Sequence, residues 1–287
     1  MKKTALICLI MVAFASAAAA GQAREIMEKV DNRNDGQTVI AHVSLTTFRY
    51  MTQNGKTRAM EQARIKRMTF VKKDEGPREK DHKSVSILRE PKSEQGIGFL
   101  QYDYEEVGKE TDQWMYLSAL GKVKRIVAGN DNEPKTGSYF GSEFNYEDME
   151  AYNLDDFTYT LLGPETYRDT DCWVIEAVPV LRKAKKSNYS RQILWIDKDR
   201  DMILKAVLFN RNGKKTKIIM SGNIETLDGI LVPRKIVVDN VESRRRTVLL
   251  YETIVLNRPV DDEFLRVRTL TDKGYRERKL QEFKDLK

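Results

Sequence analysis

The sequence predicts a mainly β protein with a few helices (α+β), built on one large antiparallel sheet. Apolar residues recur at every second position in several segments, for example over Ile230–Val238, which is the pattern of a strand with one apolar face. Three dipeptides, Asn54-Gly55, Asn212-Gly213 and Asp228-Gly229, supply the positive φ angles that two-residue hairpin turns require. Helical periodicity is confined to short segments. We therefore expect antiparallel meanders.

The expected strands are runs rich in β-branched and aromatic residues that end at turn-forming or charged residues. Beyond the Asp228-Gly229 turn, Val248, Leu250, Ile254 and Leu256 repeat the period of two. Further strands are expected at Ala41–Met51, Ala63–Val71, Ser84–Leu88, Gly98–Tyr104, Gln113–Leu117, Lys122–Val127, Phe157–Leu162, Cys172–Val178 and Gln192–Asp197.

Helical patterns occur at three places. Ala23–Val30 is amphipathic, and Tyr146–Tyr152 follows a possible cap at Asn145. In the last twelve residues Leu280, Phe283 and Leu286 recur at intervals of three, which is compatible with a weak terminal helix or a frayed end. Polar segments predict long loops, either as a rim or lid or as simple solvated connections; they are Lys72–Lys83, Gly129–Gly137 and Leu181–Ser190.

The N-terminus has the form of a cleaved secretory signal peptide. Met1-Lys2-Lys3 precedes an apolar stretch, and small residues at Ala18 and Ala20 suit cleavage before Gly21. The alternative is an uncleaved N-terminal anchor. Cys8 lies inside the apolar stretch and not at the cleavage point, so no lipid anchor is expected. We therefore divide the chain into a signal peptide (1–20), one β domain (21–275) and a charged tail (276–287).

The balance of charge points to an acidic partner. The formal net charge is +7, and it falls to +5 when Lys2 and Lys3 leave with the signal. An exported protein does not meet cytosolic nucleic acid, so anionic membrane surfaces or acidic partners are the expected targets, and no nucleic acid is.

The residues give little support to catalysis. Only His42 and His82 are present, far apart and without a partner at ligand spacing, which disfavours a zinc site or a histidine triad. No phosphate-binding loop occurs, so we expect no cofactor and no metal. Paired acids at Asp155-Asp156 and Asp261-Asp262 are ordinary in a chain with 32% charged residues. Cys172 is expected to be a buried apolar residue, and the protein is not expected to be an enzyme.

Aromatic residues crowd the middle of the chain. Along the two strands Gly98–Tyr104 and Gln113–Leu117, we expect Phe99, Trp114 and Tyr116 to share one face. With Phe140 and Phe144 they are our candidate lining of a concave apolar wall that holds acyl chains. Ordinary core packing explains the same pattern equally well.

An ordered set of short motifs resembles the LolA-like family of outer-membrane lipoprotein-sorting proteins. In the first half the motifs are Trp114-Met115-Tyr116-Leu117, Lys124-Arg125-Ile126 and Gly141-Ser142-Glu143-Phe144-Asn145-Tyr146-Glu147-Asp148. In the second half they are Ile196-Asp197, Asn212-Gly213-Lys214, Asp228-Gly229-Ile230 with Val232-Pro233, and Pro259-Val260-Asp261-Asp262 with Phe264. Ser118 stands where the family often has proline, which affects only a strand end.

The resemblance implies a strongly curved antiparallel sheet that forms an unclosed barrel, with helices plugging its concave side around a hydrophobic cavity. It also implies a periplasmic location and a carrier or chaperone that moves lipid or lipoprotein acyl chains between membranes. Its partners would be an RND-type inner-membrane transporter or an outer-membrane acceptor. The alternative from the same fold is an RseB-like sensor or adaptor that binds a membrane protein, because one fold hosts several functions.

Overall fold

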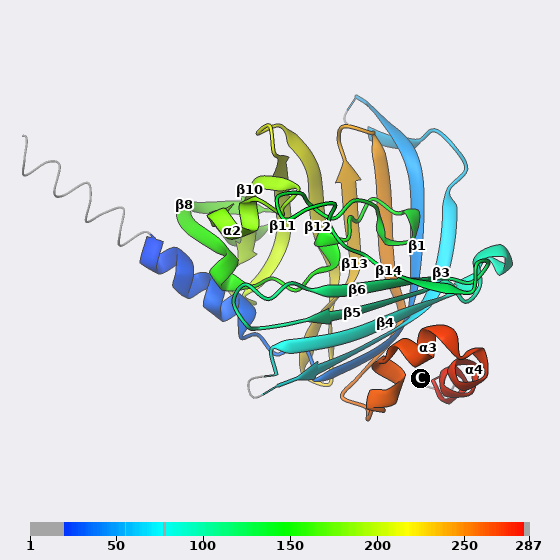
Figure 1. The fold of residues 1–287 in the computed structure, drawn as a ribbon. Helices are drawn as coiled ribbons and strands as arrows, with labels where there is room; N and C mark the ends of the chain where they lie inside the picture. The colour runs from blue at the N-terminus through cyan, green and yellow to red at the C-terminus, as the bar shows by residue number, and fades with distance from the viewer. Residues whose placement is uncertain (1–19, 55, 77–78, 284–287) are drawn as a thin grey trace, which may run out of the picture.

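The computed structural model describes residues 20–54, 56–76 and 79–283, and it is dominated by β-strands (Figure 1). Of the expected signal peptide, residues 1–19 lie outside the described residues, whereas the expected cleavage site between Ala20 and Gly21 falls at the start of the N-terminal helix. The strands of the first half are β1 (Thr38–Gln53), β2 (Lys56–Ala59), β3 (Arg64–Glu75), β4 (Asp81–Glu90), β5 (Gly98–Asp103), β6 (Asp112–Leu117) and β7 (Lys122–Arg125). Those of the second half are β8 (Phe157–Tyr167), β9 (Thr170–Pro179), β10 (Tyr189–Asp197), β11 (Met202–Asn210), β12 (Lys215–Leu227), β13 (Ile230–Asn240) and β14 (Arg245–Leu256).

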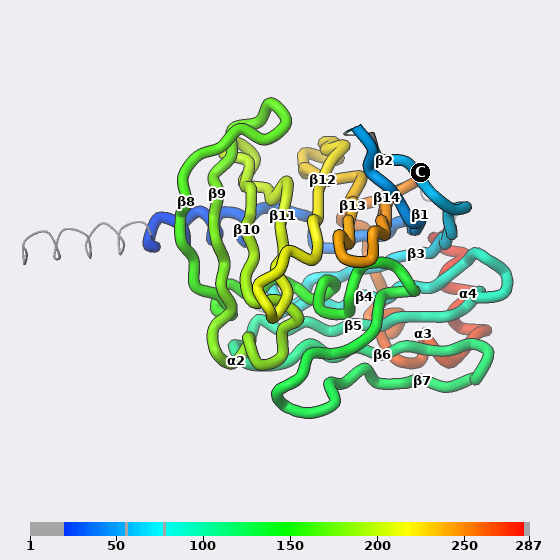
Figure 2. The backbone as a smooth tube through the Cα atoms, turned by 90° about the horizontal axis from the view of Figure 1, so that it is seen from above, coloured from blue at the N-terminus to red at the C-terminus, as the bar shows by residue number. Residues whose placement is uncertain are grey.

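Within the described residues all 14 strands belong to one antiparallel sheet. Its order is β7-β6-β5-β4-β3-β1-β14-β13-β12-β11-β10-β9-β8, and β2 pairs with β1 alone. The sheet curves strongly, and its edge strands β7 and β8 are not paired with each other, so the barrel is not closed (Figure 2). The predicted fold class, an unclosed barrel of mainly β structure with a few helices, is confirmed.

The turn chemistry explains why neighbouring strands in the sequence pair in the sheet. Asp228 and Gly229 have φ angles of +50° and +79° between β12 and β13, and Gly213 has φ +75° between β11 and β12. Both predicted hairpins are formed, but only Asp228-Gly229 is a two-residue turn, because β11 and β12 are joined by residues 211–214 and Asn212 does not have a positive φ. Asn54, between β1 and β2, has φ +51°, while its partner Gly55 lies outside the described residues.

The expected loop Lys72–Lys83 is wrong over most of its length, because β3 continues to Glu75 and β4 begins at Asp81. Polar side chains hold these strand ends together. His82 Nδ1 on β4 lies 2.7 Å from Asp74 Oδ1 on β3, and Lys72 Nζ, on the same strand as Asp74, lies 3.1 Å from that oxygen. Charged residues thus extend a strand pair beyond its apolar part.

The connection from β7 to β8 must cross the sheet, because these strands lie at opposite edges. It contains three 3₁₀ turns: η2 (Tyr139–Gly141), η3 (Glu147–Met149) and η4 (Leu154–Asp156). We call residues 138–156 the plug and the sheet face that they cover the inner face. The expected loop at Gly129–Gly137 is confirmed, whereas the helix expected at Tyr146–Tyr152 is only the single turn η3.

The N-terminal helix, residues 20–31, also covers the inner face (Figure 1). Ala23 and Met27 are fully buried, and they pack in one cluster with Phe157, Ile175 and Leu194 from β8, β9 and β10. The amphipathic helix expected at Ala23–Val30 is therefore confirmed. None of the helices in the described ranges is long and apolar enough to cross a membrane.

The C-terminal segment covers the opposite, outer face of β3 to β6. It contains η5 (Asp262–Leu265), α3 (Val267–Thr271) and α4 (Lys273–Glu282). Leu270 and Leu280 pack with Ile87 and Leu100 in a closed cluster. The terminal helix is thus formed as far as Glu282, and it spans the boundary that we expected between 275 and 276. The remaining elements are η1 (Lys92–Glu94) and α2 (Leu181–Ala184).

Candidate functional site

A cavity of about 610 Å³ lies between the N-terminal helix, the plug and the inner face of β3 to β5. This volume falls in the ordinary range for ligand pockets. Its apolar lining comes from all three parts of the fold and from β11; the residues are Met27, Phe70, Phe99, Tyr139, Met149 and Ile203.

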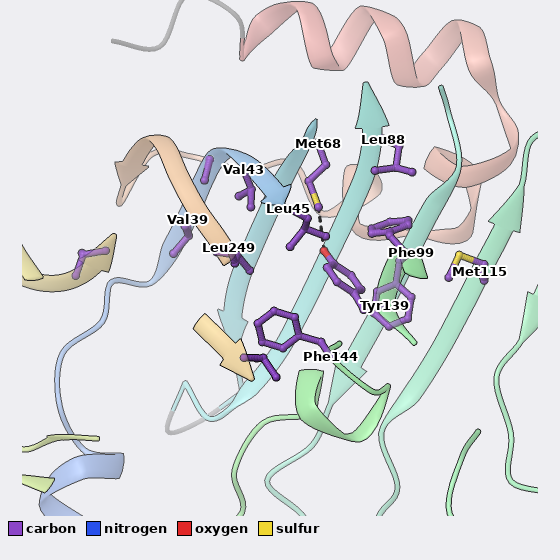
Figure 3. Close-up of a cluster of buried hydrophobic side chains, with 14 of the residues drawn as sticks. Val39, Val43, Leu45, Met68, Leu88, Phe99, Met115, Tyr139, Phe144 and Leu249 are labelled. Carbon is purple, nitrogen blue, oxygen red and sulfur yellow. Dashed lines mark hydrogen bonds between the residues drawn. The ribbon is translucent and has the colours of Figure 1, made fainter. Parts of the chain in front are cut away.

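Aromatic side chains form one wall of this cavity, and two of them, Phe99 and Tyr139, belong to the buried cluster drawn in Figure 3. The rings of Phe99 and Tyr139 meet edge to face with centroids 5.2 Å apart, and Tyr146 stacks on Phe99 at 5.9 Å. The Tyr139 hydroxyl donates a hydrogen bond of 2.6 Å to Ser86 Oγ, which satisfies its polar end, and burial raises the pKa of Tyr139. The wall is therefore apolar although tyrosines contribute to it.

Charged residues line the same cavity at the end where β1 begins and β3 ends. Lys72 is held between Asp35 and Asp74, with both carboxylate oxygens 3.1 Å from its Nζ. Burial alone would lower the pKa of Lys72, but the two carboxylates outweigh it and raise the pKa. Lys80 forms an ion pair of 2.8 Å with Asp31 on the N-terminal helix. The cavity thus has an apolar part and a polar part.

A wider, mostly polar groove of about 960 Å³ adjoins this cavity. The two share Lys80, His82, Asp103 and Tyr152 among their lining residues. Asp103 is buried and accepts hydrogen bonds from Gln101 Nε2 at 2.7 Å and Thr111 Oγ1 at 2.8 Å. Burial raises the pKa of Asp103 in spite of these bonds. The Tyr152 hydroxyl is buried without a hydrogen-bond partner among the described residues.

The plug is attached to the sheet through polar groups at its main chain. Gln101 and Gln113 lie opposite each other on β5 and β6, and both side chains are buried. Gln101 Nε2 donates to the carbonyl oxygen of Met149 at 2.6 Å, and Gln113 Nε2 donates to that of Tyr146 at 2.9 Å. These amides fix the position of the plug above the strands.

A buried ion pair attaches the plug to β12, in the other half of the sheet. Asp148 Oδ2 lies 2.6 Å from Lys217 Nζ on β12, and the two side chains are 1% and 4% exposed. The Tyr189 hydroxyl donates to Asp148 Oδ1 at 2.6 Å, and the backbone N–H of Asn145 donates to Oδ2 at 2.7 Å. Both oxygens of this buried carboxylate therefore accept hydrogen bonds from other parts of the fold.

Two further carboxylates tie the plug to the segment between β9 and β10. Glu150 lies 3.0 Å from both Lys135 and Lys183. Burial alone would raise the pKa of Glu150, but Lys183 and Lys135 lower it. Glu147 accepts a hydrogen bond of 2.7 Å from the backbone N–H of Asn188, and burial raises its pKa. The backbone is already extended at Glu150 (φ −70°, ψ 145°), so the expected helix stops at η3.

The structure places the five candidate residues on two different faces. Phe99, Phe140 and Phe144 are buried in one inner-face cluster, in which Phe99 and Phe140 meet edge to face at 6.4 Å. Trp114 and Tyr116 face the opposite way, with the C-terminal helices. The expectation that Phe99 shares a face with these two residues is therefore wrong.

The strand register is the cause of this error. Phe99 pairs with Met115, while Trp114 pairs with Leu100 and Tyr116 pairs with Gly98. Directly opposed residues in an antiparallel pair point to the same face, so an offset of one residue exchanges the faces. Period two within each strand does not reveal this offset.

The histidine His42, the paired acids and Cys172, which the sequence offered as chemically reactive groups, make structural contacts. His42 lies 3.0 Å from Thr253 Oγ1, far from His82, and within the described ranges no three His, Cys, Asp or Glu residues could hold a metal ion. Asp155 pairs with Arg24, and Asp262 pairs with Lys73. Cys172 is a fully buried free thiol, as expected.

Sequence reasoning missed most of the polar residues of the site. Lys72, Asp74 and His82 fell in a segment that was interpreted as a loop. The plug carboxylates Asp148 and Glu147 were interpreted only as acids at the N-terminal end of the helix expected at Tyr146–Tyr152. The signal that could have found them is the density of acids in the run 147–150 of an otherwise aromatic segment.

Comparisons with known proteins agree with this architecture. A family model described as "Uncharacterized protein" matches residues 80–272. A DUF1329 family protein from Desulfovibrio piger has a similar structure, with a TM-score of 0.77 and 22% identity over 88% of this chain and 99% of its own. A putative outer membrane lipoprotein-sorting protein domain from Vibrio parahaemolyticus has a TM-score of 0.75 and 23% identity over 88% and 99%.

A third solved structure extends the same likeness. The LolA superfamily protein NE2245 from Nitrosomonas europaea has a TM-score of 0.61 and 20% identity, over 85% of this chain and 97% of its own. At such identities the likeness shows the fold. No curated protein sequence matches the chain significantly.

Proposed function

We propose that this chain, which belongs to the family whose model matches residues 80–272, is a periplasmic carrier of lipid or lipoprotein acyl chains. Its fold is that of the LolA superfamily. The observation that supports this function best is the cavity of about 610 Å³ on the inner face, with its apolar aromatic wall and its charged end. The protein then acts by binding and releasing its cargo, without a cofactor.

The amphipathic lining suits a ligand with an acyl chain and a polar head. An acyl chain gains about 0.8 kcal/mol for each methylene that it buries, so roughly a dozen methylenes contribute about 10 kcal/mol before ordering costs. The acyl chain of the ligand would lie against Phe99 and Tyr139, and the polar head of the ligand would lie near Lys72 and His82. The adjoining groove leaves room for a head group or for the first residues of an acylated polypeptide.

The proposed cavity lining keeps three of the five candidates from the sequence. Phe99 lines the cavity directly, and Phe140 and Phe144 support its wall from within the same cluster. Trp114 and Tyr116 are not proposed as ligand contacts.

The cellular part of the proposal rests on the signal-peptide pattern of residues 1–20 and on the resemblance to LolA-like proteins. We propose that residues 1–20 are removed on export and that the protein exchanges cargo with an inner-membrane transporter of the RND type or with an outer-membrane acceptor. Exchange requires that the cargo leave, and a cavity that is partly open to the adjoining groove supports this requirement.

Native mass spectrometry of protein purified from its own periplasm tests the carrier function. We expect a bound species whose mass matches a lipid or an acylated polypeptide, and we expect it to move to acceptor vesicles during incubation. Protein that carries no such species, and that also fails to take up a fluorescent fatty acid, would contradict the proposal. Tight binding to one membrane protein without any transfer would favour a sensor or adaptor.

A further inference from the structure

The hairpin formed by the end of β1 and by β2 presents a basic, apolar surface that the cavity does not explain. β2 pairs with β1 alone, so the two strands form a ribbon at the end of the sheet away from the charged end of the cavity (Figure 1). Met51 and Met60 on this ribbon are 41% and 62% exposed, which is unusual for large apolar side chains.

The register brings these methionines together with arginines on one face of the ribbon. Met51 pairs directly with Arg58. The backbone N–H of Met60 donates to the carbonyl oxygen of Arg49 at 2.9 Å. Met60 is therefore opposite Arg49, next to the pair of Tyr50 and Ala59. Because side chains alternate along a strand, Arg49, Met51, Arg58 and Met60 lie on the same face.

Arg64 extends this face where β3 begins. It pairs with Thr47, which has the same parity along β1 as Arg49 and Met51. We call Arg49, Met51, Arg58, Met60 and Arg64 the basic ribbon face. All five side chains are exposed.

The charge of the basic ribbon face is largely unbalanced. Many basic residues elsewhere pair with carboxylates, but none of its three arginines forms an ion pair with another residue in the described ranges. The acid beside them is Glu61, whose Oε1 accepts a hydrogen bond of 3.1 Å from the backbone N–H of Arg49. Three guanidinium groups and one carboxylate leave a net positive surface.

We propose that the basic ribbon face docks the protein on an anionic membrane surface. The arginines match the negative charge of lipid phosphates, and each basic residue near such a surface contributes about 1 kcal/mol, or about fivefold in binding. The flexible, unbranched methionines reach into the apolar boundary beneath the head groups, while the long arginine stems keep their charges at the phosphate level.

Flotation with large unilamellar vesicles tests this surface, using protein with the N-terminus found in the cell. Vesicles contain either phosphatidylcholine alone or phosphatidylcholine with one quarter phosphatidylglycerol. We expect binding to the anionic vesicles only, and its loss in 0.5 M salt because exposed charges are then screened. Equal binding to both vesicle types would overturn the proposal.

Two variants locate the effect on the ribbon. The triple substitution Arg49→Gln, Arg58→Gln and Arg64→Gln is expected to weaken binding about 100-fold, from about fivefold for each charge. Met51→Ser with Met60→Ser is expected to weaken it about three- to tenfold by removing apolar burial. These side chains are exposed, so far-UV circular dichroism and fatty-acid binding stay unchanged, which separates this surface from the cavity.

A matched control removes the same charge elsewhere. The control is a triple substitution of exposed residues, Lys122→Gln, Lys124→Gln and Arg278→Gln. We expect this variant to bind vesicles like the wild type. A loss equal to that of the ribbon variant would show that net charge alone is responsible and would overturn the proposal. Binding to native membranes but not to protein-free vesicles of their extracted lipids would do the same, because the partner would then be an acidic protein.

Discussion

The two faces of the β5–β6 hairpin both bury apolar side chains, yet different parts of the chain cover them. The outer face, with Leu100 and Trp114, is covered by the C-terminal helices in a closed cluster. The inner face, with Phe99 and Met115, is covered by the plug, which leaves a cavity of about 610 Å³ beside the aromatic wall. Apolar alternation in a strand therefore marks burial, while the covering segment decides whether the buried face is core or binding site.

The coverings also differ in how they are attached. The C-terminal helices bury mainly apolar side chains against the sheet, whereas the plug is also held by buried amides and carboxylates such as Gln113 and Asp148. Buried polar groups need specific partners and so fix a position rather than add much stability. A plug attached in this way can stay in place over a space that is not filled.

The largest effect is expected from a charge placed in the closed outer face. Leu100 is fully buried, so Leu100→Glu should leave an isolated carboxylate in an apolar core, at a cost of several kcal/mol. We expect loss of the cooperative unfolding transition in urea. A folded variant with wild-type stability would show that the outer cluster opens readily and would remove the contrast between the two faces.

The next effect concerns the plug. Asp148→Ala leaves Lys217 buried without its partner, which should destabilise the protein by about 3–5 kcal/mol. Chemical denaturation measures this change. The double variant Asp148→Ala with Lys217→Met is expected to recover most of the loss, since no charge then remains buried. If the double variant is as unstable as the single one, the ion pair does not hold the plug in the way described.

A smaller loss is expected where the sheet meets α3 on the outer face. A Cβ atom added at Gly98 would lie 2.6 Å from Leu270 Cδ2 and 2.9 Å from Ile87 Cδ1. Gly98→Ala should therefore overpack this contact and cost about 1–3 kcal/mol in unfolding free energy, with ligand binding unchanged. Gly222→Ala is the control, because nothing lies within 4 Å of its added Cβ.

The smallest effect is a pH dependence that belongs to the inner face. The folded protein raises the pKa of Asp103 above its ordinary value of 3.8, so it binds this proton more tightly than the unfolded chain does. The contribution of Asp103 to stability is then full below about pH 4 and is lost as pH rises through the folded pKa. Asp103→Asn should remove this dependence, so the variant gains stability relative to the wild type as pH rises. Parallel stability curves from pH 3 to 8 would contradict the assignment.

Much of the sheet could be predicted from the sequence, because alternation and Asn-Gly or Asp-Gly turns act locally. The strands at Gly98–Tyr104 and Gln113–Leu117 were found almost to the residue. Their relative register was not, and Trp114 was therefore assigned to the wrong face. Register depends on which side chains meet across strands and on what covers them, and neither is a property of one segment.

Part of the candidate site could also be proposed from local sequence. Phe99 and Phe144 could be proposed because aromatic residues crowd one region. The polar residues could not, since the role of Asp148 depends on Lys217, which lies 69 residues further along the chain. The covering of the outer face by residues beyond Arg276 was also hidden, because a short charged segment has weak helical periodicity.

The central claim is that the inner face lines a binding cavity while the outer face is closed core. Ala151 is exposed and lines the cavity, so Ala151→Trp should fill it without disturbing the sheet; Thr160→Trp, on the exposed side of β8, is the matched control. Titration with a fluorescent fatty acid measures the result directly. We predict at least about tenfold weaker binding for Ala151→Trp and for Phe99→Glu, with native circular dichroism for Ala151→Trp and wild-type binding for Thr160→Trp. Unchanged affinity in a folded Ala151→Trp variant would contradict the account.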